Sequence, residues 1–513
     1  MLEIDPSPAS RKGKNILIFC DGTGNKFIDD SEAHGSNSNV VKLYSTMKID
    51  SEQVAYYHPG VGTAGDPSAK SWLARQWSVV KGLAFAWGFK DNVLDAYRYL
   101  METYKDGDRV YMFGFSRGSY TVRALGGLLD GYGLLCKGNE GHLPYAWNEY
   151  VGQHDDRKLH HVEPNKRFKE TFAHKNFRIH FMGIWDTVSS VGWVTTPLRL
   201  YSVAHNPIID IGRHAISIDE HRCFYRDNLW TGADRSLLIK HPLSANLPQP
   251  GQDLLQLWFA GVHSDIGGSY PRKECVLSNI ALDWLMREAT KAGAATLPEM
   301  RELVMGVTVP PTGDPLLDQK IEDLKSLYER PVESKVHKSL RGLWWLLELL
   351  PHRYYDKDDG KENWRTPLGM RRRLPRGAFI HSSVKERMKE HADYKPKNLQ
   401  GGAASLQEID VPGQDPRSVY VYEPATDSQP IQNKAVMRVA VMVLVSLLDL
   451  AFVVVALAIV GGIGCWVWHH WILWVWHCPI LWMWHHWMLP AWHCWVLPVW
   501  NCLHRWVSTI CAA

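Results

Sequence analysis

Short apolar runs alternate with longer amphipathic stretches from the N-terminus to about residue 306. Runs of strand length, rich in β-branched and aromatic residues, occur at 15–20, 54–57, 110–113, 177–185 and 254–262. Between them, apolar residues recur at helical spacing, as in 89–104 and 120–135. Strands that alternate with helices predict an α/β fold, in which helices cover both faces of a mostly parallel sheet.

After about residue 306 the pattern changes. Residues 317–328 and 340–350 have helical spacing, 356–364 is a charged loop, and Arg371, Arg372, Arg373 and Arg376 form a basic cluster. Residues 398–432 have the composition of a linker. We therefore predict a catalytic domain at 14–390, of which 311–390 is a helical cap or insertion, and a linker at 391–433.

Residues 439–460 are apolar except for Ser446 and Asp449. A helix of this length spans about 30 Å, the thickness of the hydrocarbon layer of a membrane. The central Asp449 costs on the order of 3 kcal/mol on insertion scales, and the surrounding aliphatic residues can offset that cost. We predict a transmembrane helix; a buried core helix, pairing with a second helix and an interfacial position are the alternatives.

The charges around this segment predict its orientation. Lys434 and Arg438 precede it closely, whereas Arg505 is the only lysine or arginine after it. Positive residues favour the cytoplasmic side, so the catalytic domain is predicted to be cytoplasmic on a single-pass membrane protein. The first residues also lack the basic and then apolar layout of a signal peptide.

The C-terminal tail, 466–513, is rich in tryptophan, histidine and cysteine. From Trp468 onward it forms octads that each begin with tryptophan. A period of eight fits neither a heptad nor a straight helix, and Pro479, Pro490 and Pro498 would interrupt helices. The tail could lie at a membrane interface or bind soft metals. A low-complexity expansion is the interpretation that we favour.

The overall composition is that of an ordinary globular protein. The net charge of +3 and the absence of an aromatic and basic RNA-binding signature give no reason to expect a nucleic-acid partner. Four cysteines are scattered through the first 430 residues without a C-x-x-C pair. Neither a disulfide framework nor a metal site is predicted, and no cofactor is expected.

The most informative motif of the chain is a hexapeptide, Gly114-Phe115-Ser116-Arg117-Gly118-Ser119. It follows a strand-like run and precedes apolar residues at helical spacing, which is the context of a nucleophile elbow. Such a turn lifts the serine hydroxyl above the end of a sheet and leaves room only for small residues two positions away on either side. The sequence therefore predicts Ser116 as the nucleophile of a serine hydrolase.

A serine nucleophile needs a base and an acid that orients the base. Asp186 and His263 follow Ser116 in the order found in α/β-hydrolases, each near the end of a predicted strand. Asp265 is an alternative acid, although its distance of two residues from His263 suits a role in shaping the turn. For the oxyanion hole we predict the backbone N–H of Arg117 together with Gly22 and Thr23, which follow the first strand.

An apolar strand followed by Asp21-Gly22-Thr23 also resembles the start of haloacid-dehalogenase phosphatases. Those enzymes need a nucleophilic aspartate two residues before the motif aspartate. Phe19 occupies that position here, so the phosphatase hypothesis is weak.

A set of motifs resembles the catalytic domain of type VI secretion lipase effectors of the phospholipase type. In chain order the motifs lie at 18–23, 39–43, 57–62, 114–119, 185–188 and 262–268. The resemblance covers about residues 14–390. It implies an α/β-hydrolase fold, a triad of Ser116, Asp186 and His263, and hydrolysis of glycerophospholipid esters by the effectors.

These observations predict a membrane-associated serine ester hydrolase that acts on a phospholipid or another acyl ester through an acyl-enzyme. Residues 340–350 could lie in a lipid interface, guard the site or pack on the core. The alternatives are a non-catalytic, membrane-tethered binding or toxin module with a hydrolase-like domain, and a soluble esterase.

Overall fold

The computed structural model of the chain divides into two units, residues 1–430 and 431–513. The structure describes residues 13–22, 37–60, 78–152, 166–188, 192–193, 196–197, 200–230, 252–325, 335–342, 344–355, 362–411, 413–415 and 417–424, all in the first unit. The predicted transmembrane segment 439–460 and the octad tail 466–513 lie outside these residues. Among the helices that are described, none is both long and apolar enough to cross a membrane.

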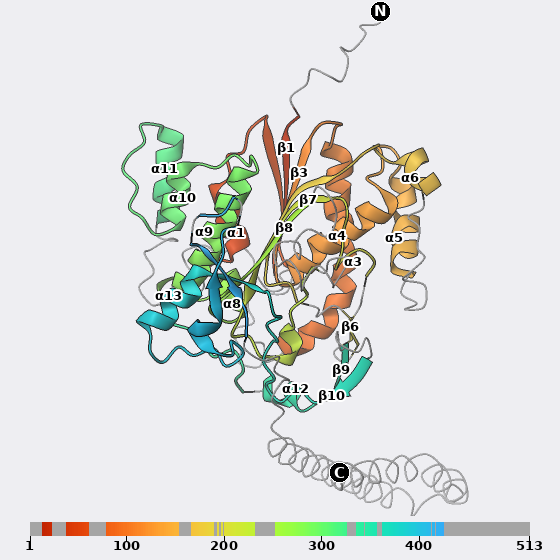
Figure 1. Ribbon diagram of the computed structural model, residues 1–513. Helices are drawn as coiled ribbons and strands as arrows, with labels where there is room; N and C mark the ends of the chain where they lie inside the picture. Colours follow the sequence, from red (N-terminus) through yellow and green to blue (C-terminus); the bar gives the residue numbers. More distant parts are fainter. Residues whose placement is uncertain are drawn as a thin grey trace, which may run out of the picture. The chain divides into compact units, whose positions relative to one another are not determined.

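A mixed, mostly parallel sheet forms the centre of the described part of the chain (Figure 1). Its strands follow the order β12-β13-β11-β8-β7-β4-β3-β1-β2. The strand bounds are β1 Asn15–Cys20, β2 Gln53–His58, β3 Arg109–Phe115, β4 Ile179–Trp185, β7 Ile209–Ser217, β8 Asp253–Phe259, β11 Phe379–His381, β12 Leu406–Glu408 and β13 Val419–Tyr422. Neighbouring strands from β2 to β11 pair in parallel, whereas β13 pairs antiparallel with both β11 and β12.

Helices pack on both faces of this sheet (Figure 1). One face carries α3 Ser78–Thr103, α4 Arg117–Tyr132, α5 Leu143–Gly152 and α6 Lys166–Phe172; the other carries α1 Asn39–Thr46, α8 His263–Gly267, α9 Val276–Lys291, α10 Pro298–Val304, α11 Pro315–Lys325 and α13 Ser382–Glu390. The predicted α/β fold with a mostly parallel sheet is confirmed.

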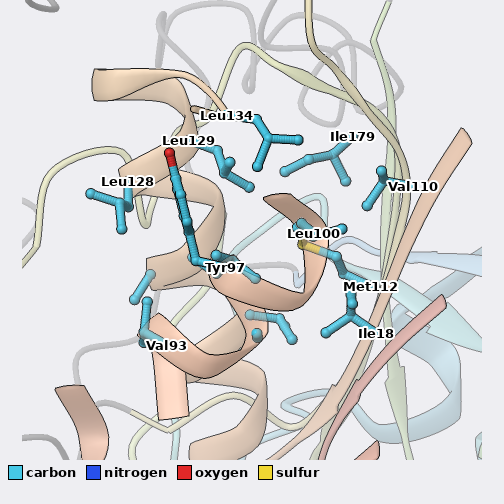
Figure 2. Close-up of a cluster of buried hydrophobic side chains, with 14 of the residues drawn as sticks. Ile18, Val93, Tyr97, Leu100, Val110, Met112, Leu128, Leu129, Leu134 and Ile179 are labelled. Atoms are coloured by element: carbon cyan, nitrogen blue, oxygen red, sulfur yellow. The ribbon is translucent and has the colours of Figure 1, made fainter. Parts of the chain in front are cut away.

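The central strands are buried on both sides because their side chains alternate between two cores. In β1, Ile16 and Ile18 join one hydrophobic cluster, and Leu17 and Phe19 join the other. Figure 2 shows the first cluster, where Tyr97 and Leu100 of α3 pack with side chains from the strands and from α4. Continuous apolar runs are the expected sequence of strands that are buried on both faces.

Several short elements complete the described structure. Helix α12 Trp344–Glu348 and the hairpin of β9 His352–Tyr355 with β10 Glu362–Arg365 lie close together in Figure 1, and β5 Gly192–Trp193 pairs with β6 Thr196–Pro197. The 3₁₀ helices are η2 Glu140–His142, η3 Cys223–Tyr225, η5 Arg272–Glu274 and η7 Gly402–Ser405.

Strand β7 does not correspond to any predicted strand. Its sequence contains Arg213 and His214, which interrupt the apolar pattern. Both side chains are buried because each has polar partners: Arg213 pairs with Glu288 and Asp253, and His214 faces Gln256. In addition, β8 ends at Phe259 rather than at residue 262, so His263 begins a helix four residues after the strand.

The prediction of a linker at 391–433 is wrong for residues 406–422. These residues contribute β12 and β13, which extend the main sheet at one edge. The predicted cap, 311–390, is not purely helical either, because β11 pairs with β8 in the same sheet. Strands of three or four residues are too short to produce a readable alternation of apolar and polar positions.

Candidate active site

Ser116 lies in a strained turn between β3 and α4. Its backbone angles are φ 59° and ψ −120°, which few residues other than glycine adopt. A Cβ atom on Gly114 would come within 2.7 Å of the backbone of Gly118, and one on Gly118 within 2.1 Å of the Cys20 carbonyl oxygen. The close approach of strand, turn and helix therefore explains why both flanking positions of the motif are glycine.

The structure brings Ser116, His263 and Asp186 together in one chain of hydrogen bonds. His263 Nε2 lies 2.7 Å from Ser116 Oγ, and His263 Nδ1 lies 2.5 Å from Asp186 Oδ2. The three residues are 6%, 3% and 1% exposed, so little water competes for these bonds. The partners favour the tautomer in which Nδ1 donates to the carboxylate and Nε2 accepts from the serine hydroxyl.

The electrostatics of the pair suit a neutral imidazole that can accept a proton. Burial lowers the pKa of His263, and the hydrogen bond to Asp186 opposes this effect only in part. Burial alone would raise the pKa of Asp186, but Arg372 and His263 hold it well below its usual range. Asp186 is therefore ionised while His263 is neutral at neutral pH.

His263 is the first residue of α8, and its neighbours fix the ring from several sides. The ring packs against those of Phe115 and Tyr225, with centroids 4.7 Å and 4.6 Å away. Its backbone N–H donates to Glu220 Oε2 over 3.2 Å. The imidazole is thus oriented by contacts with several elements as well as by Ser116 and Asp186.

Asp265, the alternative acid, has other partners. Its Oδ2 accepts from the N–H of Val262 over 2.9 Å, and its Oδ1 lies 2.6 Å from Nδ1 of His337. His337 also contacts Glu274 and stacks on Tyr270 with ring centroids 3.6 Å apart. The geometry therefore favours Asp186 as the partner of His263 and gives Asp265 a role in shaping the turn.

Sequence reasoning missed Arg372, which binds the Asp186 carboxylate directly. Nη1 donates to Asp186 Oδ1 over 2.5 Å and Nη2 donates to Oδ2 over 3.0 Å. In the sequence, Arg372 is one of three consecutive arginines, and Arg373 beside it is exposed. No local pattern indicates which arginine of such a run turns inward.

A second missed feature is the wall of the site formed by Glu220, Arg222, Tyr225 and Trp344. Arg222 pairs with the fully buried Glu220 at 2.8 Å. Its guanidinium carbon lies 3.7 Å from the ring centroid of Tyr225 and 5.0 Å from that of Trp344, within the range of cation–π contacts. Because Tyr225 also touches His263, this wall connects His263 to α12.

The predicted oxyanion-hole residues have different surroundings. Arg117 begins α4, and the N–H groups of a first helical turn point out of the helix. The end of β1 lies against the elbow, as the contact of Gly118 with Cys20 shows. However, the Gly22 N–H already donates to Asp21 Oδ1 over 2.7 Å, and Thr23 lies outside the described residues. The roles of Arg117, Gly22 and Thr23 remain predictions.

In the part of the chain that the structure describes, no group of three or more potential ligands is arranged to hold a metal ion.

Comparison with known proteins places the chain in a family. The family model described as "T6SS, Phospholipase effector Tle1-like, catalytic domain" matches residues 14–288, which is more than half of the chain. The chain belongs to this family. The match includes Ser116, Asp186 and His263 and ends before Arg372. The predicted resemblance to this group of effectors is thereby confirmed.

The individual proteins that the chain resembles have low sequence identity to it. The uncharacterized protein YEL023C of Saccharomyces cerevisiae is 26% identical over 565 aligned positions, which cover 77% of this chain and 82% of the yeast protein. An uncharacterized protein from Pseudomonas aeruginosa of known structure is 21% identical, with a TM-score of 0.36. That match covers 62% of this chain but about half, 49%, of the Pseudomonas chain. The Tle1 effector, solved bound to the VgrG spike of the type VI secretion system, is 14% identical, with a TM-score of 0.32 and coverage of 69% and 91%.

Proposed function

We propose that the protein is a serine hydrolase that cleaves acyl esters of phospholipids through Ser116, His263 and Asp186, on a fold of the α/β-hydrolase type. Membership of a phospholipase effector family supports a hydrolase of the lipase or phospholipase type in general. The observation that carries the finer assignment is the hydrogen-bond chain from Ser116 Oγ through His263 to Asp186. Its geometry is the arrangement that activates a serine.

In the first half-reaction, Ser116 Oγ attacks the ester carbonyl carbon. Its proton passes to His263 Nε2, 2.7 Å away, while the carbonyl oxygen gains negative charge. Asp186 stabilises the imidazolium that forms and keeps the ring in the required tautomer. When the tetrahedral intermediate collapses, the C–O bond to the alcohol breaks, and His263 returns the proton to the leaving oxygen.

In the second half-reaction, water attacks the acyl-enzyme. His263 Nε2 removes a proton from the water, the second tetrahedral intermediate forms, and the fatty acid leaves as Ser116 Oγ takes the proton back. The N–H of Arg117 is the first donor that we assign to the oxyanion of both intermediates. Gly22 can serve as the second donor only if its N–H leaves Asp21 Oδ1.

The surroundings of the site support a lipid substrate. Tyr225 and Trp344 form an aromatic wall next to His263. Trp345 and Leu350, in and just after α12, are 46% and 40% exposed, and Trp364 of β10 is 58% exposed. Trp345 follows Trp344 in α12, and exposed apolar side chains beside a site suit contact with acyl chains or with the lipid interface.

The direct test compares the wild type with Ser116→Ala on phospholipid vesicles. Products are identified by lipid mass spectrometry, which also reports the acyl position that is cleaved. We expect release of fatty acid and lysophospholipid by the wild type only. Equal release by both proteins would contradict the assignment of Ser116, and hydrolysis of soluble esters without any phospholipid hydrolysis would favour the soluble-esterase hypothesis.

We also propose that residues 439–460 anchor the protein in a membrane, with the catalytic domain on the cytoplasmic side. The support is the apolar length of the segment and the position of Lys434 and Arg438 before it. Carbonate extraction of full-length protein and of a version that stops at residue 432 tests this proposal. Full-length protein that is monodisperse without detergent would contradict the anchor.

A further inference from the structure

Arg372 contacts the same carboxylate that orients His263. Its two terminal nitrogens reach one oxygen of Asp186 each, at 2.5 Å and 3.0 Å. A guanidinium that bonds both oxygens fixes the plane of a carboxylate as well as its position. The direction of the bond from Asp186 Oδ2 to His263 Nδ1 depends on that plane.

Arg372 is itself held rigidly. Nη1 also donates to Ser217 Oγ over 2.6 Å, at the end of β7, and Nε donates to the carbonyl oxygen of Tyr225 over 3.1 Å. The residue is 6% exposed, and all three of its side-chain nitrogens have partners. Arg372 therefore links the Asp186 carboxylate to the end of β7 and to Tyr225 in the wall of the site.

We propose that Arg372 is a positioning residue of the triad, which fixes the orientation of Asp186 and sets how tightly the Asp186–His263 pair holds a proton. The proposal rests on the proposed function. Arg372 touches no reacting atom, so its effect reaches the reaction through Asp186 and His263. It lies beyond residue 288, where the family match ends.

The charges around Asp186 and His263 determine whether loss of Arg372 raises or lowers the proton affinity of this pair. Arg372 is the cation that contacts Asp186, His263 is its titratable partner, and the Ser217 N–H donates to its Oδ1 over 2.8 Å. If Arg372 becomes neutral, a buried carboxylate loses its strongest cation. The pair then binds its proton more tightly, whichever of the two residues carries it.

The other charged groups near the Asp186–His263 pair should affect its proton affinity almost equally with and without the charge of Arg372. Glu220 and Arg222 face His263, but they form an ion pair with each other. His214 lies near Asp186 and is neutral, because burial lowers its pKa to about 3. Asp227 acts on Arg372, and Tyr225 lines the His263 ring. None of these groups replaces the bidentate contact.

The experiment measures kcat and KM against pH for the full-length protein with a soluble short-chain nitrophenyl ester. The variants are Arg372→Met, which removes the positive charge, and Arg372→Lys, which keeps the charge but cannot form the bidentate contact with both Asp186 oxygens. Arg373→Met is the matched control, because Arg373 is the exposed neighbour. Thermal unfolding of each variant reports whether the fold is retained.

The acid limb is the part of the pH profile in which kcat/KM falls as the pH is lowered. For Arg372→Met we expect this limb to move to higher pH by about one unit or more. We expect kcat above this limb to fall by about 10- to 100-fold, with little change in KM, because the imidazole is less well aligned. Arg372→Lys should keep the acid limb of the wild type and still lower kcat. Arg373→Met should match the wild type.

An unchanged acid limb in a folded Arg372→Met variant would overturn the proposal, even if the melting temperature of the variant fell. A merely structural role of Arg372 would lower stability without moving the acid limb. If Arg372→Met does not fold, Arg372→Lys provides the test. A kcat equal to that of the wild type in Arg372→Lys would also overturn the proposal. Failure of the proposed function looks different. In that case hydrolysis would not depend on Ser116 in the wild type, and both proposals would fall together.

Discussion

Residues 13–288 and residues 335–424 contribute to the candidate site in different ways. The first region carries the elbow, Asp186 and His263, each close to the end of a strand and each marked by a local motif. The second carries Arg372, His337 and Trp344, which have no motif and reach the site through contacts between distant parts of the chain. The residues that we propose to react thus come from one region, and much of what holds them in place comes from the other.

This difference separates two kinds of substitution. Changes in the first region should affect the chemical step directly. Changes in the second should affect the orientation, the proton affinity or the local stability of the triad, and their effects should be smaller.

The largest effect is expected for Ser116→Ala. Without the nucleophile, ester hydrolysis should fall by on the order of 10³-fold or more, since only binding and oxyanion stabilisation remain. Initial rates on a nitrophenyl ester, with the melting temperature as a control for folding, measure this loss. A loss below about tenfold would show that the reaction does not need this serine.

The next largest effect is expected for Asp186→Asn. The amide removes the charge that stabilises the imidazolium and leaves the tautomer of His263 uncontrolled, so kcat should fall by about 10²-fold or more. Asp265→Asn is the matched control, because it changes a carboxylate close to His263 that bonds Val262 and His337 instead. A greater loss of kcat in Asp265→Asn than in Asp186→Asn would reverse the assignment of the acid.

The smallest effect concerns stability and belongs to the second region. His337 lies between Asp265 and Glu274; burial opposes its protonation, but these two partners prevail and raise its pKa above the usual value. Because the folded-state pKa exceeds the unfolded value of about 6.5, the stabilisation is fully present below that pH and disappears as pH rises through the folded pKa.

His337→Gln should therefore lower the free energy of unfolding more at pH 5.5 than at alkaline pH. Urea unfolding of both proteins across this pH range measures the difference. A difference that stays constant with pH would show that protonation of His337 contributes nothing to the docking of residues 335–342.

The same two regions show what could be predicted from the sequence. Strands β1, β3 and β4 were predictable because burial on both faces requires continuous apolar runs. Strand β7 was not, because Arg213 and His214 are buried only with the help of partners from other elements. The short edge strands β12 and β13 depend on pairing with β11, which no local pattern reveals.

The candidate site divides in the same way. Ser116, Asp186 and His263 could be proposed because parallel strands bring their carboxyl ends to one edge of the sheet. The bond between Arg372 and Asp186 joins residues 186 positions apart, so nothing in the surrounding sequence indicates it. The Gly22 N–H was a reasonable oxyanion donor by position, and only the structure shows that it donates to Asp21.

The central claim is that Ser116 is an activated nucleophile. Labelling with a fluorophosphonate, followed by digestion and peptide mass spectrometry, tests it most directly. We expect a single phosphonyl adduct on Ser116, formed by the wild type, absent from Ser116→Ala and strongly slowed in Asp186→Asn. An adduct on another residue, or labelling that persists in Ser116→Ala, would contradict the assignment.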